Sequence, residues 1–390
     1  MATPEQQRLL RALNPWLADP AQRGAAAASR VPAGFIHRRA GAALRAALDR
    51  PERAHLVIGP RQAGKSTLIW WALQGERPLV YLNCEEPLVR SWCASPALLA
   101  ADLADYLPPG GVLFLEEAQW LDEAGLLVKG LVDAQRGWTI LVTGSSSFHL
   151  LSRPRESLAG RATRHTLFPL DLAEVAPPVP LPGPTRLRRA PTVDQLLRFG
   201  GYPGAWTAGD ARADVLAELK EAFVLRDASD RFKIERPDAF RRLMQLMALQ
   251  VGDLVNLAEW ASLLGVAGTT VAQYLAILEE SHVVRAIRPF VGGKRAELTK
   301  TPKLFFVDNG LRNAAAGGFG ELPLRPDRGK LVENFVFSEL HKRWPMPGQV
   351  RYWRSENGAE VDFVLEPQPG RLVAIEVKAG ALDKLSRSAR

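Results

Sequence analysis

The sequence predicts an α/β protein whose first large domain is a parallel sheet with helices on both faces. Short apolar segments alternate with helical segments in this part of the chain, which is typical of such a sheet. The expected strands are residues 55–58, 79–82, 111–115, 139–143 and 164–168. A glycine-rich loop follows the first strand, and farther along the chain two helices precede a basic hairpin. The length of 390 residues allows two or three domains.

The first 50 residues are expected to form a helical region ahead of the sheet. Leu9, Leu10 and Leu13 recur at helical spacing, and a second apolar helical pattern ends at Leu48. Asn14-Pro-Trp16 ends the first helix, because the residue before a proline disfavours the helical conformation.

The loop after the first strand fits the phosphate-binding pattern G-x-x-x-x-G-K-[S/T] at every defined position. Its residues are Gly59, Pro60, Arg61, Gln62, Ala63, Gly64, Lys65 and Ser66. The two glycines let main-chain N–H groups point at phosphate oxygens. Lys65 supplies a cation for the β- and γ-phosphates, and the Ser66 hydroxyl is a ligand for Mg²⁺. A helix over 66–74, which includes Thr67, would turn its N-terminus toward the anion.

An ordinary glycine-rich surface turn is the alternative to a phosphate loop. It does not explain why a buried strand precedes the loop and a helix follows it. We therefore expect the chain to bind ATP together with Mg²⁺.

Two acidic residues, Glu116 and Glu117, end the third expected strand. A phosphoryl-transfer site needs one carboxylate near Mg²⁺ and a second that orients and deprotonates the attacking water. We assign the first role to Glu116 and the second to Glu117, since open α/β sheets bind ligands at the carboxyl ends of their strands. The alternative is that the two acids open a helix and favour its dipole.

Hydroxyl side chains end the next strand, in the segment Thr143-Gly-Ser145. We expect Thr143 and Ser145 to hydrogen-bond the γ-phosphate or the attacking water, with a plain Gly-Ser turn as the alternative. Arg161 is a candidate catalytic arginine finger that reaches the nucleotide of a neighbouring subunit. An intrachain salt bridge is the other interpretation of Arg161.

The formal net charge of +8 indicates a polyanionic partner, with nucleic acid first, or else an arginine-rich solvated surface. The two cysteines, Cys84 and Cys93, have no metal-ligand spacing. No apolar run is long enough to cross a bilayer, and the N-terminus lacks the layout of a secretion signal. We therefore expect a cytoplasmic protein without a membrane partner.

The second half of the chain begins after the proline-rich segment 177–184, which marks a boundary. Helices are expected from 191 to 250. Beyond them the expected elements are a helix at 256–264, a helix at 269–280 and strands at 283–289 and 304–307. Helix, turn, helix and basic hairpin is the order of a winged helix.

The expected DNA contacts are basic residues of the hairpin, Lys294, Arg295, Lys300 and Lys303, and Arg285 and Arg288 add to the positive charge of the same hairpin. The second helix carries no Lys or Arg and turns Thr269, Thr270 and Gln273 outward, which is a poor set for reading base edges. Contact with the DNA backbone is therefore expected. The alternative is a winged helix that packs against another subunit.

The last part of the chain is expected to hold a helix at 330–344 and strands at 350–353, 360–365 and 372–377. Asp362 and Glu376 lie on consecutive strands, and Glu376 and Lys378 would point to one side because side chains alternate. With Glu333 from the helix, they form a possible nuclease site that holds a divalent cation and polarises a water. This set looks like the PD-(D/E)xK nuclease fold; metal-dependent cleavage and nucleic-acid positioning or a structural role are both open.

Together these motifs resemble a family of bacterial and archaeal AAA-type P-loop ATPases whose C-terminal half was described as a domain of unknown function. The resemblance covers nearly the whole chain. Besides the phosphate loop it rests on the segments 14–16, 116–119, 143–145, 160–161, 200–203, 303–308, 360–362 and 376–378. The family has Asp where this chain has Glu116. Because the extra methylene shifts the carboxylate outward, we expect Glu116 to contact Mg²⁺ through a water molecule.

The resemblance implies five regions, which are listed here in chain order. They are an N-terminal helical region (1–50), an AAA-type ATPase core (51–178), a helical lid or linker (185–250), a winged helix (251–318) and a PD-(D/E)xK-like module (325–390). Since the chain ends at Arg390, shortly after Lys378, we expect this last module to be incomplete.

The function expected from these features is a DNA-dependent AAA-type ATPase. It would be a ring-forming homo-oligomer, with a hexamer favoured, that acts on duplex or branched DNA by translocation or branch migration. Two alternatives stay open. One is an ATP-gated, metal-dependent nuclease, and the other is an ATP-switched signalling or defence protein that binds a protein partner.

Overall fold

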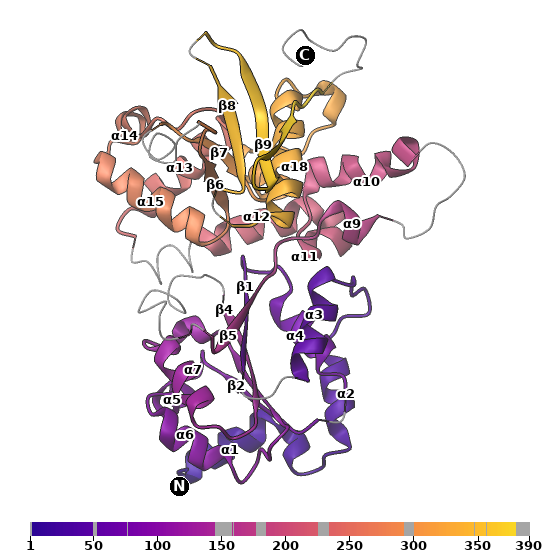
Figure 1. Cartoon of the computed structure of the whole chain (residues 1–390), viewed down its shortest axis with the longest axis vertical. Coiled ribbons are helices and arrows are strands. Elements are labelled where there is room, and N and C mark those ends of the chain that lie inside the picture. The colour runs from indigo at the N-terminus through magenta and orange to yellow at the C-terminus, as the bar shows by residue number, and fades with distance from the viewer. Residues whose placement is uncertain are drawn as a thin grey trace. The chain divides into compact units, whose positions relative to one another are not determined.

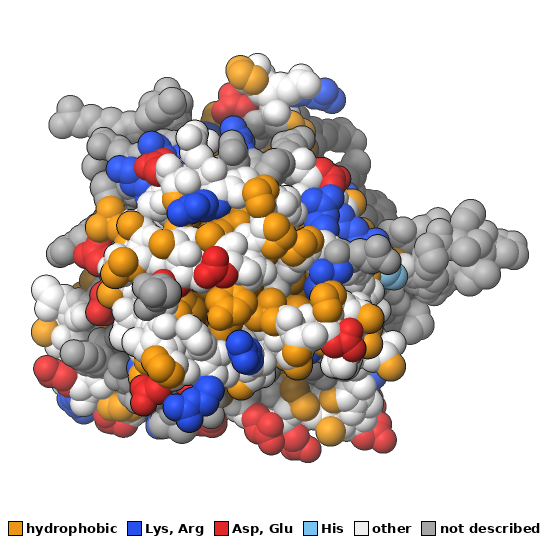
Figure 2. Space-filling model, turned by 90° about the horizontal axis from the view of Figure 1, so that it is seen from below, with side chains coloured by type: hydrophobic (Ala, Val, Ile, Leu, Met, Phe, Trp, Pro, Cys, Tyr) orange, Lys and Arg blue, Asp and Glu red, His pale blue; other side chains and the backbone are white. Residues whose placement is uncertain are grey.

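The computed structural model describes most of the chain. The described residues are 2–49, 53–75, 77–144, 158, 160–176, 185–224, 234–291, 300–346, 348–355 and 357–379, with the backbone alone at 185–191. They belong to two compact units, Met1–Leu167 and Phe168–Arg390, which we call the first and second units (Figure 1). On the face drawn in Figure 2, basic, acidic and hydrophobic side chains are interspersed, so the positive surplus is not gathered there.

The first unit is built on a five-stranded sheet of order β2-β3-β4-β1-β5, in which neighbouring strands are parallel. Its strands are β1 (Ala54–Ile58), β2 (Leu79–Asn83), β3 (Val112–Glu116), β4 (Thr139–Gly144) and β5 (Ala162–Thr166). The structure confirms the parallel α/β sheet that the alternating apolar segments predict. Ile58 pairs with Gly144 and Asn83 with Glu116, so the carboxyl ends of these strands are in register.

Helices cover both faces of this sheet. The helices are α1 (Pro4–Leu13), α2 (Gln22–Ser29), α3 (Arg39–Leu48), α4 (Lys65–Ala72), α5 (Pro87–Cys93), α6 (Pro96–Leu103) and α7 (Ala124–Asp133), with short 3-10 turns η1 (Pro15–Leu17) and η2 (Ala118–Trp120). Successive strand residues point to opposite faces. Leu113 and Leu115 therefore join a core with α5–α7, whereas Val112 and Phe114 join a second core with α2–α4 (Figure 1).

The segment Asn14-Pro-Trp16 fastens the N-terminal helix to the edge strand β2. The Asn14 side-chain amide donates to the Tyr81 carbonyl at 2.9 Å, and the Tyr81 amide donates to Asn14 Oδ1 at 2.6 Å. Trp16 Nε1 donates to the Leu79 carbonyl at 2.8 Å. These bonds satisfy polar backbone groups that an open sheet edge would otherwise leave without partners.

The second unit is mostly helical and contains two small antiparallel sheets. Its helices are α9 (Leu172–Val175), α10 (Thr185–Phe199), α11 (Pro203–Thr207), α12 (Arg212–Ala222), α13 (Pro237–Leu249), α14 (Leu257–Leu264), α15 (Gly268–Glu280), α17 (Asn309–Ala316) and α18 (Arg328–Arg343), with 3-10 turns η3 (Gly209–Ala211) and η5 (Leu322–Leu324). Its strands are β6 (Val284–Ile287), β7 (Lys303–Phe306), β8 (Val350–Arg354), β9 (Glu360–Gln368) and β10 (Arg371–Ile375).

Two helices and an antiparallel strand pair, α14, α15, β6 and β7, follow one another as the sequence predicts. Val271, Tyr274 and Leu278 of α15 are buried, and Gln273 on the opposite side is exposed. Within the described residues no single helix is long and apolar enough to cross a membrane. Only α14 and α15 taken together, bent by 107°, have the length and composition for it, and both contribute side chains to the core.

A buried network of hydrogen bonds connects the segments 200–203 and 303–308, on which the family resemblance partly rests. Gly201 N–H donates to Asp308 Oδ2 at 2.7 Å, and a Cβ on Gly200 would lie 2.1 Å from Asp308 Oδ1. The Asn309 amide donates to the Leu331 carbonyl and accepts from Asn334 at 2.6 Å. Burial raises the pKa of Asp308. These residues hold the turn before α11 against α17 and α18, which is a structural role.

Candidate nucleotide-binding site

The carboxyl edge of the parallel sheet collects most of the predicted site. The phosphate loop leaves β1, Glu116 ends β3 with Glu117 directly after it, and Thr143 lies near the end of β4. Because β1 lies beside β4 and β4 beside β3, these segments come out at one edge of the sheet. The structure thus brings together residues that lie as many as 84 positions apart, between Gly59 and Thr143.

The backbone of the loop requires its two glycines. Gly59 has a φ of +150°, and a Cβ there would lie 1.9 Å from the Leu167 carbonyl oxygen. Gly64 has a φ of +89° and caps the start of α4. Both conformations are ones that residues with a side chain rarely adopt. Gln62, also at positive φ, is exposed, whereas Ala63 is fully buried.

Lys65 folds back over its own loop. Its Nζ donates to the carbonyls of Gly59 at 3.2 Å and Pro60 at 2.8 Å, and the residue is 5% exposed. Ser66 and Thr67 follow in the first turn of α4 and are half-buried. The turn of α4 that carries them begins at the loop, so its free N–H groups and positive dipole end face the same region as the Lys65 ammonium.

Arg38 is a site residue that sequence reasoning missed. Its guanidinium donates to the Ala63 carbonyl at 2.8 Å and is 9% exposed, so it holds the phosphate loop from the N-terminal region. Arg38 lies just before α3 and belongs to no recognisable spacing pattern. No local signal in the sequence could have assigned it to the loop.

The two acids at the end of β3 have different surroundings. The Tyr81 hydroxyl donates to Glu116 Oε2, and the pKa of Tyr81 is raised, first by burial and then by the Glu116 charge. Glu117 has a φ of +55°, and its carboxylate accepts a hydrogen bond from Gln119 Nε2. Each carboxylate is thus oriented by one neutral donor and is half-buried at the sheet edge.

Thr143 makes a contact within the chain that the sequence does not predict. Its side chain is fully buried, and its Oγ1 accepts a hydrogen bond from the Glu117 N–H at 3.0 Å. The hydroxyl therefore fixes the turn that presents Glu117, and the expected contact with the γ-phosphate or the attacking water stays a prediction. Ser145, the second hydroxyl expected there, lies outside the described residues.

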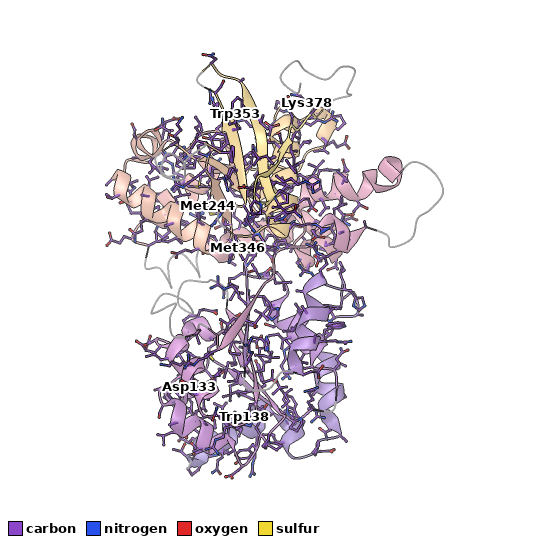
Figure 3. All side chains as sticks on the ribbon, in the orientation of Figure 1. Asp133, Trp138, Met244, Met346, Trp353 and Lys378 are labelled. Atoms are coloured by element: carbon purple, nitrogen blue, oxygen red, sulfur yellow. The ribbon has the colours of Figure 1, made fainter. Side chains whose placement is uncertain are left out.

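Arg161 forms an intrachain ion pair. Its Nε lies 2.7 Å from Asp133 Oδ1 at the end of α7, and the two side chains are 38% and 43% exposed. Asp133 is marked in Figure 3. This is the alternative that the sequence left open; a role across a subunit boundary stays a prediction.

The loop and its neighbours fit a triphosphate with Mg²⁺. Gly59 and Gly64 give both ends of the loop the backbone conformation of a phosphate loop, since Gly59 packs against the Leu167 backbone without room for a Cβ and Gly64 is left-handed. Lys65 offers a cation, and Ser66 and Glu116 offer the hydroxyl and carboxylate oxygens that Mg²⁺ prefers. Nothing in this set disagrees with the nucleotide and metal that the pattern predicts.

The acids of the second unit are arranged differently from the nuclease site that the sequence suggests. Lys303 was expected to contact DNA, but it is 5% exposed and its ammonium contacts Glu360 and lies 3.5 Å from Glu333 Oε1. The prediction for Lys303 is therefore wrong: as the first residue of β7 its side chain turns inward. Burial lowers the pKa of Lys303, but the Glu333 and Glu360 charges outweigh burial and raise it above the ordinary value.

Glu376 and Lys378 do not lie in a strand, because β10 ends at Ile375. They contact each other as an ion pair, and Lys378 (Figure 3) is 48% exposed. Asp362 accepts a hydrogen bond from the Val377 N–H at 2.6 Å. Among the described residues no three His, Cys, Asp or Glu side chains are grouped to hold a metal ion. Strand alternation, on which the expected set of Asp362, Glu376 and Lys378 depended, is thus interrupted.

The other hairpin residues give little information on DNA contact. Lys294 and Arg295 lie outside the described residues, and Lys300 is exposed before β7. Their contact with DNA stays a prediction.

Comparisons with known proteins agree with the geometry of the first unit. Residues 51–176 match a family described as "AAA domain". Residues 190–322 and 328–389 match two domains of unknown function, DUF8612 and DUF4143. The AAA-type P-loop core that the motifs resemble is thus confirmed, and the winged helix and the nuclease-like module stay predictions.

Relatives and solved structures extend the comparison along the chain. Uncharacterized proteins of Mycobacterium tuberculosis and Mycobacterium bovis are each 31% identical over 370 residues, covering 93% of this chain and 78% of theirs. The Walker-type ATPase paby2304 of Pyrococcus abyssi aligns with 73% of this chain and 97% of its own at a TM-score of 0.45 and 16% identity. The chain therefore belongs to the same family as the two mycobacterial proteins and carries an AAA-type ATPase domain.

Proposed function

We propose that this protein hydrolyses ATP at the carboxyl edge of its parallel sheet and couples hydrolysis to work on DNA. The observation that carries the first half is the convergence of the phosphate loop with Glu116 and Glu117 at that edge. Phosphoryl transfer needs positioning and charge stabilisation more than covalent chemistry, and this edge supplies both.

Each residue has a distinct task in this proposal. Lys65 exchanges its two carbonyl partners for phosphate oxygens, which are stronger acceptors because they are charged. Ser66 and Glu116 would hold Mg²⁺, which would supply positive charge beside the phosphates. Glu117 orients the attacking water and takes up its proton, and the Thr143 hydroxyl keeps the Glu117 turn in place.

The DNA part of the proposal is supported by charge and by the elements of the second unit. The chain has a net charge of +8, and α14, α15, β6 and β7 follow the order expected of a winged helix. Thr269 and Gln273 on the outer side of α15 carry no charge, so contact with the sugar–phosphate backbone is favoured over base reading. We further propose a ring, with a hexamer favoured, that translocates on duplex DNA or migrates branches.

ATP turnover of the full chain tests the proposal directly. We expect Mg²⁺-dependent hydrolysis that rises several-fold with duplex or four-way-junction DNA. Glu117→Gln should lower turnover by roughly 10²- to 10⁴-fold while nucleotide binding is retained. Activity that survives in Glu117→Gln would come from a contaminant or another base. Turnover that is unchanged by every DNA would refute the coupling and favour an ATP-switched signalling protein.

The subunit arrangement has a test with a matched control. Arg161→Ala and Asp133→Asn both remove the same intrachain ion pair. If Arg161 acts across a subunit boundary, only Arg161→Ala should lower turnover, by roughly 10³-fold or more, in the assembled protein. Equal activity of the two variants would limit Arg161 to the salt bridge. Electron microscopy with an ATP analogue gives the ring size.

A metal-dependent nuclease is not favoured by the described acids. Glu333 and Glu360, which a divalent cation would need, already lie against the Lys303 ammonium. We therefore propose no cleavage at this site.

A further inference from the structure

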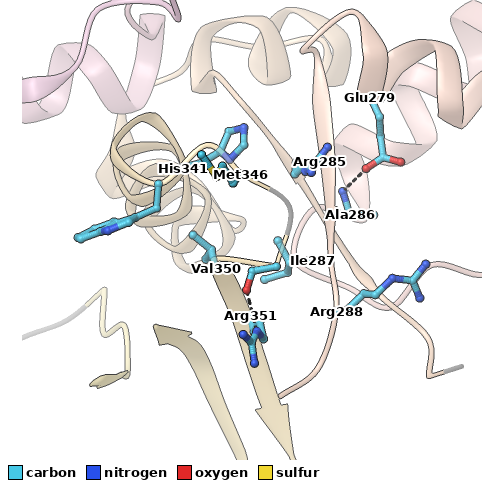
Figure 4. A pocket seen from close by; sticks show the side chains of 11 residues that line it. Glu279, Arg285, Ala286, Ile287, Arg288, His341, Met346, Val350 and Arg351 are labelled. Atoms are coloured by element: carbon cyan, nitrogen blue, oxygen red, sulfur yellow. Dashed lines mark hydrogen bonds between the residues drawn. The ribbon is translucent and has the colours of Figure 1, made fainter. Parts of the chain in front are cut away.

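A pocket opens in the second unit where two strands separate. After the C-terminal end of β6, Pro289 forms a β-bridge with Tyr352 of β8, and the Phe290 N–H donates to the Tyr352 carbonyl at 2.5 Å. Farther back along β6 the two strands are no longer joined, and a cavity of about 370 Å³ lies between β6, β8 and the end of α18 (Figure 4). This volume is within the range of small-ligand pockets.

Three guanidinium groups line the pocket: those of Arg285, Arg288 and Arg351. One carboxylate, that of Glu279, also lines it, and its Oε1 accepts a hydrogen bond from the Ala286 N–H at 2.9 Å (Figure 4). The wall is therefore cationic on balance. A cationic concave surface attracts an anion and raises its local concentration.

Arg285 is the most informative of these residues. It is half-buried on β6, and among the described residues its guanidinium has neither a hydrogen-bond nor an ion-pair partner. A partly desolvated charge without a partner is costly. Arg285 lies across the pocket from His341 and Met346 (Figure 4), so a ligand placed between them would lie beside the guanidinium.

Arg351 is held in place at the bottom of the pocket. Its Nε donates to the Gly348 carbonyl at 2.7 Å, its Nη2 lies 3.6 Å from Glu366, and its guanidinium lies 5.4 Å from the centre of the Phe290 ring. A guanidinium fixed in this way needs little reorganisation when an anion binds. Arg288 is exposed at the rim of the pocket.

His341 forms the opposite wall as a neutral ring. It stacks on Phe337, with ring centres 5.4 Å apart, and is 5% exposed. Burial lowers the pKa of His341 to about 3, and the positive charge of Arg285 acts in the same direction. A neutral imidazole can donate one hydrogen bond to an anion without adding a charge.

We infer that this pocket binds a phosphate group, with Arg285 as its principal partner. Arginine matches phosphate because its planar fork donates two parallel, charge-assisted hydrogen bonds. The phosphate comes either from a DNA backbone, in which case the inference rests on the function proposed above, or from a free phosphorylated small molecule. In both cases the contact lies at the β6–β8 separation, at residues that the sequence marks only as part of the hairpin's positive charge.

The first test measures DNA affinity with the phosphate loop already filled. The full chain is saturated with Mg²⁺ and adenylyl-imidodiphosphate, and a fluorescent duplex is titrated at several salt concentrations. Arg285→Gln should weaken binding roughly tenfold for any DNA sequence. It should also reduce the slope of log K against log salt by about one. Arg285→Lys keeps the charge, so the slope should stay while part of the affinity is lost.

Arg371→Gln is the matched control, because it removes one exposed arginine of β10 that does not line the pocket. It should bind DNA like the wild-type chain. If Arg285→Gln binds as tightly as Arg371→Gln, a DNA phosphate is not held in the pocket. Thermal unfolding of each variant checks that the fold is intact.

The second test separates the two sources of phosphate. Inorganic phosphate is added to histidine-labelled protein at constant ionic strength, again with the loop saturated, and the His341 resonances are followed by NMR. A saturable shift in the wild type that is absent in Arg285→Gln supports the pocket, even if no DNA binds and the proposed DNA function fails. An unchanged His341 together with equal DNA affinity of the variants would overturn the inference.

Discussion

Lys65 of the first unit and Lys303 of the second are equally buried, each 5% exposed, but their partners are opposite in kind. Lys65 donates to the carbonyls of Gly59 and Pro60, which are neutral. Lys303 lies among carboxylates, with Glu360 in contact and Glu333 at 3.5 Å. The carbonyls that Lys65 contacts bring no formal negative charge to its ammonium, whereas the carboxylates beside Lys303 compensate its charge inside the fold.

This difference separates a functional lysine from a structural one. A buried cation that donates to neutral carbonyls bears a desolvation cost that an anionic ligand can offset. A buried cation between acids already has that compensation, and removing it leaves the acids unpaired. Substitutions of the two lysines should therefore have their main effects on different measurements, activity for Lys65 and stability for Lys303.

The largest effect is expected from Lys65→Ala. Loss of the ammonium should reduce ATP turnover by at least roughly 10²-fold, as loss of one preorganised donor to developing charge does. The free energy of unfolding should change less than on loss of a buried ion pair, because the contacts removed are hydrogen bonds to two neutral carbonyls. Steady-state phosphate release and urea unfolding measure the two quantities. Near-normal turnover in Lys65→Ala would place hydrolysis elsewhere and remove the basis of the comparison.

Lys303→Met is expected to act on stability instead. It keeps the aliphatic stem but removes the ammonium, so Glu333 and Glu360 lose their buried cationic partner. Because removing one partner of a buried ion pair is strongly destabilising, the free energy of unfolding at pH 8 should fall by about 3 kcal/mol. Urea denaturation followed by circular dichroism measures this, and turnover per folded molecule should be unchanged.

The double variant Lys303→Met, Glu333→Gln provides the control. It removes one of the unpaired acids, so part of the lost stability should return. If Lys303→Met is as stable as the wild type, the buried cluster does not depend on this ammonium, and Lys303 would again be a candidate for contact with a ligand.

Much of the first unit could be predicted from the sequence. The strands, the phosphate loop and the pair Glu116–Glu117 were predictable because each depends on local order: apolar runs, glycine spacing and acids at a strand end. Arg38 and Tyr81 were not, because their contacts with the Ala63 carbonyl and Glu116 join segments distant in sequence and follow no spacing rule.

The errors in the second unit have a common physical cause. Lys303 was assigned to the surface and Glu376 to a strand. Both assignments assumed that the charge of a residue indicates where a strand ends and to which side the side chain points. In the structure β7 begins at Lys303 and turns it inward, and β10 ends one residue before Glu376. Because side chains alternate along a strand, a shift of one residue moves a side chain to the opposite face of the sheet. A prediction whose strand limits are uncertain by one or two residues therefore could not place these side chains.

The pH dependence of stability tests the carboxyl group of Glu333, which lies beside Lys303. Burial raises the pKa of Glu333 from 4.5 to about 7. A carboxyl whose pKa is raised by folding stabilises the fold when it is protonated, below its unfolded pKa. That contribution is lost as the pH rises through about 7. Between pH 4.5 and pH 8 the free energy of unfolding should therefore fall by roughly 2–3 kcal/mol less in Glu333→Gln than in the wild type.

Urea midpoints at several pH values for both chains measure this difference, and the slope m should stay constant. The other acids titrate in both chains and cancel in the comparison. Parallel curves for the two proteins would mean that Glu333 is ionised throughout, and that the ion pair with Lys303 outweighs burial.

The smallest effect on the free energy of unfolding is expected from Lys330→Met. Lys330 adds an exposed lysine to the comparison of the two buried ones. Lys330 contacts Asp253, but the two side chains are 38% and 50% exposed. Water solvates both charges, so loss of the pair should cost less than about 1 kcal/mol at any pH between 5 and 8. The same urea measurement should show a cost that shrinks further with added salt, because exposed pairs are screened. A loss as large as that of Lys303→Met would mean that burial does not distinguish these lysines, and partner charge alone would then have to explain the contrast with Lys65.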